Sequence, residues 1–202
     1  MKGVASQNDL VEAFVARGWR VTLDDVGQPF AEFRLAERVI AALLTKRSPT
    51  FPFNLAGWIT DDAVSVAYTA IMHPQKRRAK STPIVLSPRI DIEKEVASDE
   101  DIDRGCAQLL DWALAVDMKA GISALLDKET NGLGAMPARH LAALAATGAV
   151  DVLERYHAAF ANGDRLGFVP YIKDEHIAAA LNFARQRMEQ PEWLPNSPRL
   201  RV

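Results

Sequence analysis

The sequence predicts an α+β protein: an N-terminal helix plus a mostly antiparallel sheet, followed by an all-helical C-terminal half of stacked helical hairpins. A helix-capping pattern opens the chain, β-branched runs alternate with turn residues after it, and the apolar period becomes helical near residue 98. We therefore expect a sheet part at residues 1–97, a helical part at 98–190 and an irregular tail at 191–202.

The first helix is predicted from its start and stop signals. Ser6 and Asp9 have the spacing of a capping box, and Leu10 and Phe14 repeat at i,i+4 on one helical face. Gly18 follows as the expected C-terminal stop.

The sheet is predicted from runs rich in β-branched or alternating apolar residues. The short connections between most of them favour hairpins. The run at 38–45 could equally be a short helix, since Ala41-Ala42-Leu43-Leu44 favours helix, but Val39-Ile40 favours a strand, which we prefer. The expected strands are 20–23, 30–35, 39–45, 64–72 and 84–92.

The helical half is expected to begin with a second capping pattern, Ser98 and Asp101. Ile102, Cys106 and Leu109 then trace one apolar face, so the single cysteine of the chain is predicted to be a buried structural thiol. Glycine- and asparagine-containing turns separate the helices expected after it. These are 118–127, 137–146, 149–161 and 174–188.

A shift of the helical half against itself aligns Ala113-Leu114-Ala115 with Ala143-Leu144-Ala145. The segment from Pro137 to Leu144, followed by Gly148 and then by Val150-Asp151-Val152-Leu153, resembles an ankyrin repeat in its small-residue helix and short turn. The resemblance covers about 105–188 only. Ankyrin repeats are non-catalytic binding scaffolds, so the resemblance implies a protein partner.

The composition argues against several classes of partner. The 202 residues include 24 basic and 26 acidic ones, for a net charge of −2, which gives no overall field to attract nucleic acid or an anionic membrane. Only the run containing Lys76, Arg77, Arg78 and Lys80 is locally basic. A salt-sensitive phosphate contact there stays open as an alternative, although nucleic acid is not the partner we expect.

The N-terminus lacks the apolar core of a secretory signal, and no run approaches the roughly 20 apolar residues that span a bilayer. We therefore expect a cytoplasmic protein without a membrane contact.

The chain shows no motif for catalysis or for a bound metal. None of its four histidines (His73, His140, His157 and His176) pairs with another at a ligand spacing on one helix, and no nucleophile elbow or phosphate loop is present. We expect no metal, no cofactor and no catalytic residues.

The segment from Asn162 to Ile172 mixes apolar and polar residues between two predicted helices, as partner-binding loops do. Arg165 and Tyr171 are the expected anchors, with Lys173 and His176 nearby. The sequence thus favours a non-catalytic protein-interaction module, such as an adaptor, immunity or chaperone-like protein, with an unidentified protein partner.

The alternative is a small cytosolic enzyme of the hydrolase class, with a cleft between the two halves that residues such as His140, His157 or Asp164 face. The oligomeric state is not predicted.

Overall fold

The computed structural model describes residues 4–23, 27–35, 38–46, 53–76, 79, 81–88, 90–92 and 96–190. The chain divides into two compact units, and each unit combines two segments that are separated in the sequence. The sheet unit combines Met1–Thr60 with Pro83–Asp117, and the helical unit combines Asp61–Thr82 with Met118–Val202. The boundary expected between residues 97 and 98 falls inside the sheet unit.

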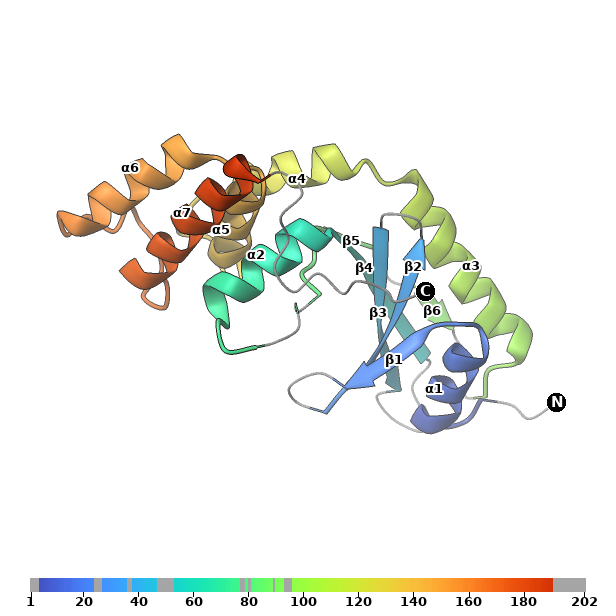
Figure 1. Cartoon of the computed structure of the whole chain (residues 1–202). Helices are drawn as coiled ribbons and strands as arrows, with labels where there is room; N and C mark the ends of the chain where they lie inside the picture. The colour runs from blue at the N-terminus through green and yellow to red at the C-terminus, as the bar shows by residue number, and fades with distance from the viewer. Residues whose placement is uncertain are drawn as a thin grey trace. The chain divides into compact units, whose positions relative to one another are not determined.

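The described part of the sheet unit contains six strands, and all of their pairings are antiparallel (Figure 1). The strand order is β1-β2-β3-β4-β5, with β6 also paired to β4. This confirms the predicted sheet, and it decides the ambiguous run at 38–45 in favour of a strand. The elements are α1 (Gln7–Ala16), β1 (Arg20–Leu23), β2 (Pro29–Leu35), β3 (Arg38–Lys46), β4 (Phe53–Thr60), β5 (Val85–Leu86), β6 (Ile90–Ile92) and α3 (Asp99–Ala115).

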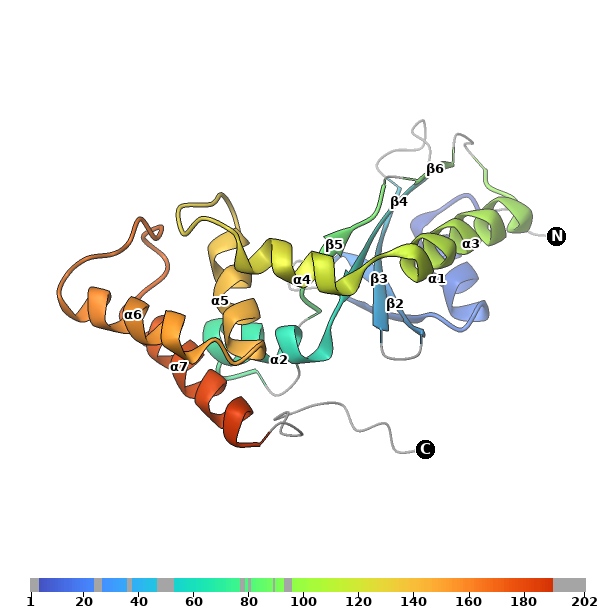
Figure 2. The ribbon, with the colours of Figure 1, turned by 90° about the horizontal axis from the view of Figure 1, so that it is seen from above.

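Both helices of this unit cover the same face of the sheet (Figure 2). Phe14 of α1 and Phe33 of β2 each lie with their ring centroid 5.2 Å from that of Trp19. On β4, Gly57 faces Leu109 of α3. The strand registers place Phe33 and Gly57 on the same face of the sheet. Helices α1 and α3 therefore bury one continuous apolar face of the sheet.

The predicted helix starts are confirmed. Ser6 and Asp9 form a complete capping box at α1, and Ser98 with Asp101 forms another at α3. Gly18 follows α1 with φ 82°, a left-handed conformation that glycine adopts without strain.

Arg17, at the end of α1, links this helix to the first turn of α3. Its Nη2 lies 3.3 Å from Oδ1 of Asp99, and its Nε lies 2.5 Å from Oδ1 of Asp103. Negative charge in a first helical turn also offsets the positive end of the helix dipole. The two carboxylates therefore stabilise α3 and, through Arg17, hold its first turn beside α1.

Cys106 is buried in α3, as predicted. Burial, which disfavours the thiolate, raises the pKa of its thiol to about 11. At neutral pH this cysteine is therefore a small apolar core residue.

The helical unit contains α2 (Asp62–Met72), α4 (Met118–Leu126), α5 (Met136–Ala146), α6 (Val150–Ala161) and α7 (Asp174–Glu189). Each of the other four helices packs against α5. Its residues Leu141–Ala145 are all buried. The four helices expected after residue 117 are confirmed to within about two residues at each end.

The prediction of a strand at 64–72 is wrong, because this segment forms α2. Its β-branched residues, Val64, Val66, Thr69 and Ile71, favour a strand by propensity. However, the side chain of Asp61 caps the helix by accepting the backbone N–H of Val64 at 3.0 Å. Packing of the helix against α5 and α7 then outweighs the local preference.

Two further differences concern β4 and the run at 84–92. Strand β4 is not among the strands predicted from the sequence, because its Asn54, Ala56 and Gly57 all have low strand propensity. The single strand expected at 84–92 is instead two short strands, β5 and β6, separated around Pro88. Proline has no backbone N–H to donate to a ladder.

His140 of α5 is buried, with 2% of its surface exposed. Its Nδ1 lies 2.9 Å from the carbonyl oxygen of Leu125, and its Nε2 lies 3.1 Å from the hydroxyl of Tyr156. A carbonyl can only accept, so Nδ1 carries the proton and Nε2 accepts from Tyr156. The neutral imidazole thereby joins α5 to the end of α4 and to α6.

We predict that Gly57→Val destabilises the protein by about 1–3 kcal/mol. A Cβ at this position would lie 2.8 Å from Cδ2 of Leu109, and Leu109 is fully buried and cannot move aside freely. Urea unfolding measures the change. The control Ala56→Val, at the exposed neighbouring position, should change stability by less than about 0.5 kcal/mol; equal effects of both variants would contradict the proposed packing.

We also predict that His140 makes the protein less stable as pH falls below about 6.5, the ordinary pKa of histidine. Burial lowers the pKa of folded His140, and the hydrogen bond to Leu125 opposes this only in part. As pH falls, the unfolded chain therefore takes up the proton first, and the free energy of unfolding declines by at most about 1.4 kcal/mol per pH unit.

The measurement is the free energy of unfolding between pH 8 and pH 5. His140→Gln should show a shallower decline, whereas Tyr156→Phe should keep the wild-type slope, because burial rather than the hydroxyl lowers the pKa. If the free energy of unfolding declines equally with pH in wild type and in His140→Gln, His140 does not contribute to the pH dependence of stability.

Candidate functional site

Two loops of the helical unit lie against each other, and we call them the paired loops: residues 127–135, between α4 and α5, and residues 162–173, between α6 and α7. The second contains the segment that the sequence indicated as a binding loop. All four predicted binding residues, Arg165, Tyr171, Lys173 and His176, lie in it or in the first turn of α7.

Arg165 holds the second loop together from within. Its Nη2 donates to the carbonyl oxygens of Val169, at 3.0 Å, and Ile172, at 2.6 Å. Its guanidinium also lies 5.4 Å from the ring centroid of Phe160. These contacts give Arg165 a structural role inside the loop, and its predicted role as a partner-binding anchor stays a prediction.

Leu166 adopts φ 51°, the only non-glycine residue of the described chain in the left-handed region. The carboxylate of Asp164 supports this turn by accepting the backbone N–H of Leu166 at 2.8 Å. A bulky residue in this conformation is strained, and such strain concentrates at functional sites.

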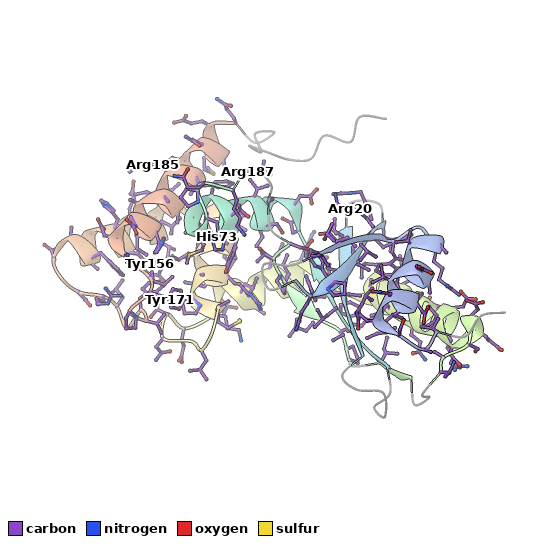
Figure 3. All side chains as sticks on the ribbon, turned by 90° about the horizontal axis from the view of Figure 1, so that it is seen from below. Arg20, His73, Tyr156, Tyr171, Arg185 and Arg187 are labelled. Carbon is purple, nitrogen blue, oxygen red and sulfur yellow. The ribbon has the colours of Figure 1, made fainter. Side chains whose placement is uncertain are left out.

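Two side-chain hydrogen bonds join the paired loops. Thr130 donates from its hydroxyl to the carbonyl oxygen of Leu166. Tyr171 donates to the carbonyl oxygen of Gly134 at 2.7 Å, which places the tyrosine beside the loop that precedes α5 (Figure 3). The two loops therefore form one structure.

Two large hydrophobic side chains of the paired loops face solvent. Leu133 is 89% exposed and Tyr171 is 41% exposed. We call these two residues the Leu133–Tyr171 surface. Leu133 is the most exposed large apolar side chain among the described residues.

Lys173 and His176 cap the start of α7. The backbone N–H of Lys173 donates to Nδ1 of His176 at 3.0 Å, and Nζ of Lys173 lies 3.7 Å from Oε1 of Glu175. Partial burial lowers the pKa of His176, which favours the neutral ring that this cap requires. Both predicted residues thus have a local structural role.

The residues proposed for a hydrolase do not form a common hydrogen-bond network among the described residues. Both ring nitrogens of His140 are occupied, and the carboxylate of Asp164 holds Leu166. His157 lies half-buried on α6. The hydrolase alternative therefore stays a prediction.

A pocket of about 170 Å³ lies beside the C-terminal half of α2. None of the three hydrolase candidates lines it. Lys76 of the basic run does, whereas Arg77, Arg78 and Lys80 lie outside the described residues. The lining residues are Val66, Thr69, Ala70, His73, Pro74, Lys76 and Ala79.

Arg139, in the first turn of α5, was not identified from the sequence. Its guanidinium is half-buried, and its Nη1 lies 3.8 Å from Sδ of Met136. Burial lowers the pKa of Arg139, while the phenol groups of Tyr68 and Tyr171 lie close enough to raise it. No sequence motif marks Arg139, because the two tyrosines come from α2 and the second loop.

Within the described ranges, no group of three or more histidine, cysteine, aspartate or glutamate residues is placed to hold a metal ion. Of the helices described, none is long and apolar enough to cross a membrane.

Residues 6–185 match a Family of unknown function (DUF6990). Neither the comparison with curated proteins nor the comparison with solved structures gives a match. The family match does not identify an ankyrin repeat, so that resemblance stays a prediction.

We predict that Arg165→Gln loosens the second loop. The charged hydrogen bonds to Val169 and Ile172 would be lost, and the backbone amides of Phe168 and Ile172 should exchange their hydrogens about tenfold faster or more. Hydrogen exchange read by NMR measures this. The control Lys173→Gln removes only an exposed ion pair and should leave both rates unchanged; unaltered rates in Arg165→Gln would refute the structural role of Arg165.

Proposed function

The chain belongs to the Family of unknown function (DUF6990), and we propose from its own residues that it is a non-catalytic protein-interaction module. The Leu133–Tyr171 surface is the proposed contact region. An adaptor, immunity or chaperone-like role would fit such a module.

The observation that carries this proposal is the exposure of Leu133 on a loop that is held in place. Single exposed apolar residues are common on protein surfaces. Leu133, however, lies one residue before Gly134, whose carbonyl oxygen accepts from Tyr171. An apolar side chain and a tyrosine are therefore presented together, and aromatic residues are enriched among those that dominate binding energy.

The internal bonds of the paired loops support the same proposal. Ordering a mobile loop on binding lowers affinity, whereas a loop already fixed in its bound conformation avoids that entropic cost. Arg165, Asp164 and Thr130 fix the loops through the bonds described above. The strained φ of Leu166 is consistent with a loop conformation retained for binding.

A cytoplasmic setting is part of the proposal. The single cysteine is a buried thiol whose raised pKa keeps it protonated, and an unpaired cysteine suits a reducing compartment.

We predict that Leu133→Asp reduces partner binding at least about tenfold, because a charge replaces the apolar contact at the centre of the surface. The measurement is quantitative affinity purification of the tagged full chain from its native cell, with the variant and wild type compared by mass spectrometry. Melting temperatures of both proteins establish that the variant is folded.

The matched control is Leu114→Asp, which places the same charge at another exposed leucine, 62% exposed on α3. It should retain the partner. A stoichiometric partner that is retained equally by Leu133→Asp and by wild type would reject the Leu133–Tyr171 surface as the contact region.

A further inference from the structure

The pocket beside α2 is a groove between this helix and the segment that follows it. Four of its lining residues have the i, i+3, i+4 and i+7 spacing of one helical face, namely Val66, Thr69, Ala70 and His73. The other lining residues belong to the following segment: Pro74, Lys76 and Ala79. The groove therefore has one wall of α2 and one wall of the chain that leaves it.

Two hydrogen bonds hold the chain beside α2 after the helix ends. The backbone N–H of Lys76 donates to the carbonyl oxygen of His73 at 2.9 Å, which turns the chain at the end of the helix. The backbone N–H of Thr82 donates to Oγ of Ser65 at 3.1 Å, near the start of the helix, and both residues are buried. The chain therefore returns along α2, and these bonds fix both ends of the returning segment.

The lining changes from buried and mostly apolar to exposed and charged. Val66 and Thr69 are buried and form the floor of the groove. Pro74 and Lys76 are exposed and lie at its open side, while His73 is half-buried between them (Figure 3). None of the described residues that line the groove is acidic. A ligand would therefore place its apolar end inside and its charged end at the rim.

The volume of the groove limits the size of the ligand. It measures about 170 Å³, and an apolar cavity of about 150 Å³ holds one benzene molecule. Drug-sized ligands need roughly 300–1,000 Å³. His73 adds an aromatic wall, and its ring centroid already lies 6.0 Å from that of Tyr68, a distance at which rings pack. A single aromatic ring therefore suits the interior.

The charge at the open side indicates the head group of the ligand. Lys76 contributes one positive charge there, which matches the single negative charge of a carboxylate. At an exposed rim, the carboxylate can pair with the ammonium group while it stays partly in water, so the desolvation cost of a buried ion pair is avoided.

We propose that this groove binds a small aromatic carboxylate. The ring packs against Val66 and Ala70 beside the imidazole of His73, and the carboxylate pairs with Lys76 at the rim. The site goes beyond the proposed interaction role, since its ligand is a small molecule and it shares no residue with the Leu133–Tyr171 surface.

NMR titration of the full-length, ¹⁵N-labelled protein with sodium benzoate tests the site, with the backbone amides of Ala70 and His73 as reporters. Benzoate should shift both signals to saturation, whereas sodium chloride at equal ionic strength should not. Acetate keeps the charge without the ring and should bind about tenfold more weakly or worse. Benzamide keeps the ring without the charge and should bind about threefold more weakly, as expected for an exposed ion pair.

Two pairs of variants locate the ligand. Ala70→Leu fills the interior with a residue that favours helix, and benzoate affinity should fall about tenfold or more; the matched control Ala124→Leu, at an exposed position of α4, should leave it unchanged. Lys76→Gln should weaken benzoate binding about threefold and Lys76→Arg should restore it. The control Lys128→Gln removes an exposed charge outside the groove and should have no effect.

Several outcomes would overturn the proposal. Non-saturating shifts that are equal for benzoate and chloride would reject binding, and unchanged benzoate affinity in Ala70→Leu would reject the groove as its place. Benzamide that binds as tightly as benzoate, or phenyl phosphate that binds about tenfold more tightly, would reject the carboxylate. Melting temperatures establish that each variant is folded, and the Lys76 variants, at an exposed position, keep the test valid if Ala70→Leu is not. None of these titrations requires a protein partner, so their failure is distinguishable from failure of the interaction role.

Discussion

Burial of α5 is the constraint on which the helical unit depends, because each of its other helices packs against this one. The alanines of α5 let neighbouring helices approach closely, and Leu141 and Leu144 fill the space between them. A buried leucine contributes about 1.5–3 kcal/mol when removed from water. With α5 enclosed in this way, its N-terminal end is fixed in position, and so are Gly134 and Arg139 at that end.

The paired loops extend this order from the helices to the surface. Tyr171 attaches the second loop to Gly134, and Thr130 attaches the first loop to Leu166. Loops are usually more mobile than the helices that they connect. In the paired loops, however, backbone and side-chain hydrogen bonds specify one conformation. The same end of α5 thus supports both the Leu133–Tyr171 surface and the half-buried guanidinium of Arg139.

The sequence was most informative where local signals and tertiary packing agree. The capping boxes at Ser6 and Ser98, and the helices after residue 117, could be predicted because start signals and apolar period coincide. At α2 the β-branched residues indicated a strand, and only contacts with α5 and α7, distant in sequence, decide otherwise. The hydrogen bonds of Arg165 within its own loop, and the bond of Tyr171 to Gly134, depend on tertiary geometry that spacing along the chain does not encode.

The helical unit is built from two segments that are separated in the sequence, and this has a consequence for synthesis on the ribosome. Helix α2 belongs to this unit, but its main packing partner, α5, begins only at Met136. The apolar side chains of α2, including Val64 and Ile71, are therefore translated well before the surface that covers them. The apolar side chains of α2 therefore stay uncovered while β5, β6 and α3 are synthesised. Exposed apolar surface of this kind on a nascent chain is prone to aggregation and is bound by chaperones.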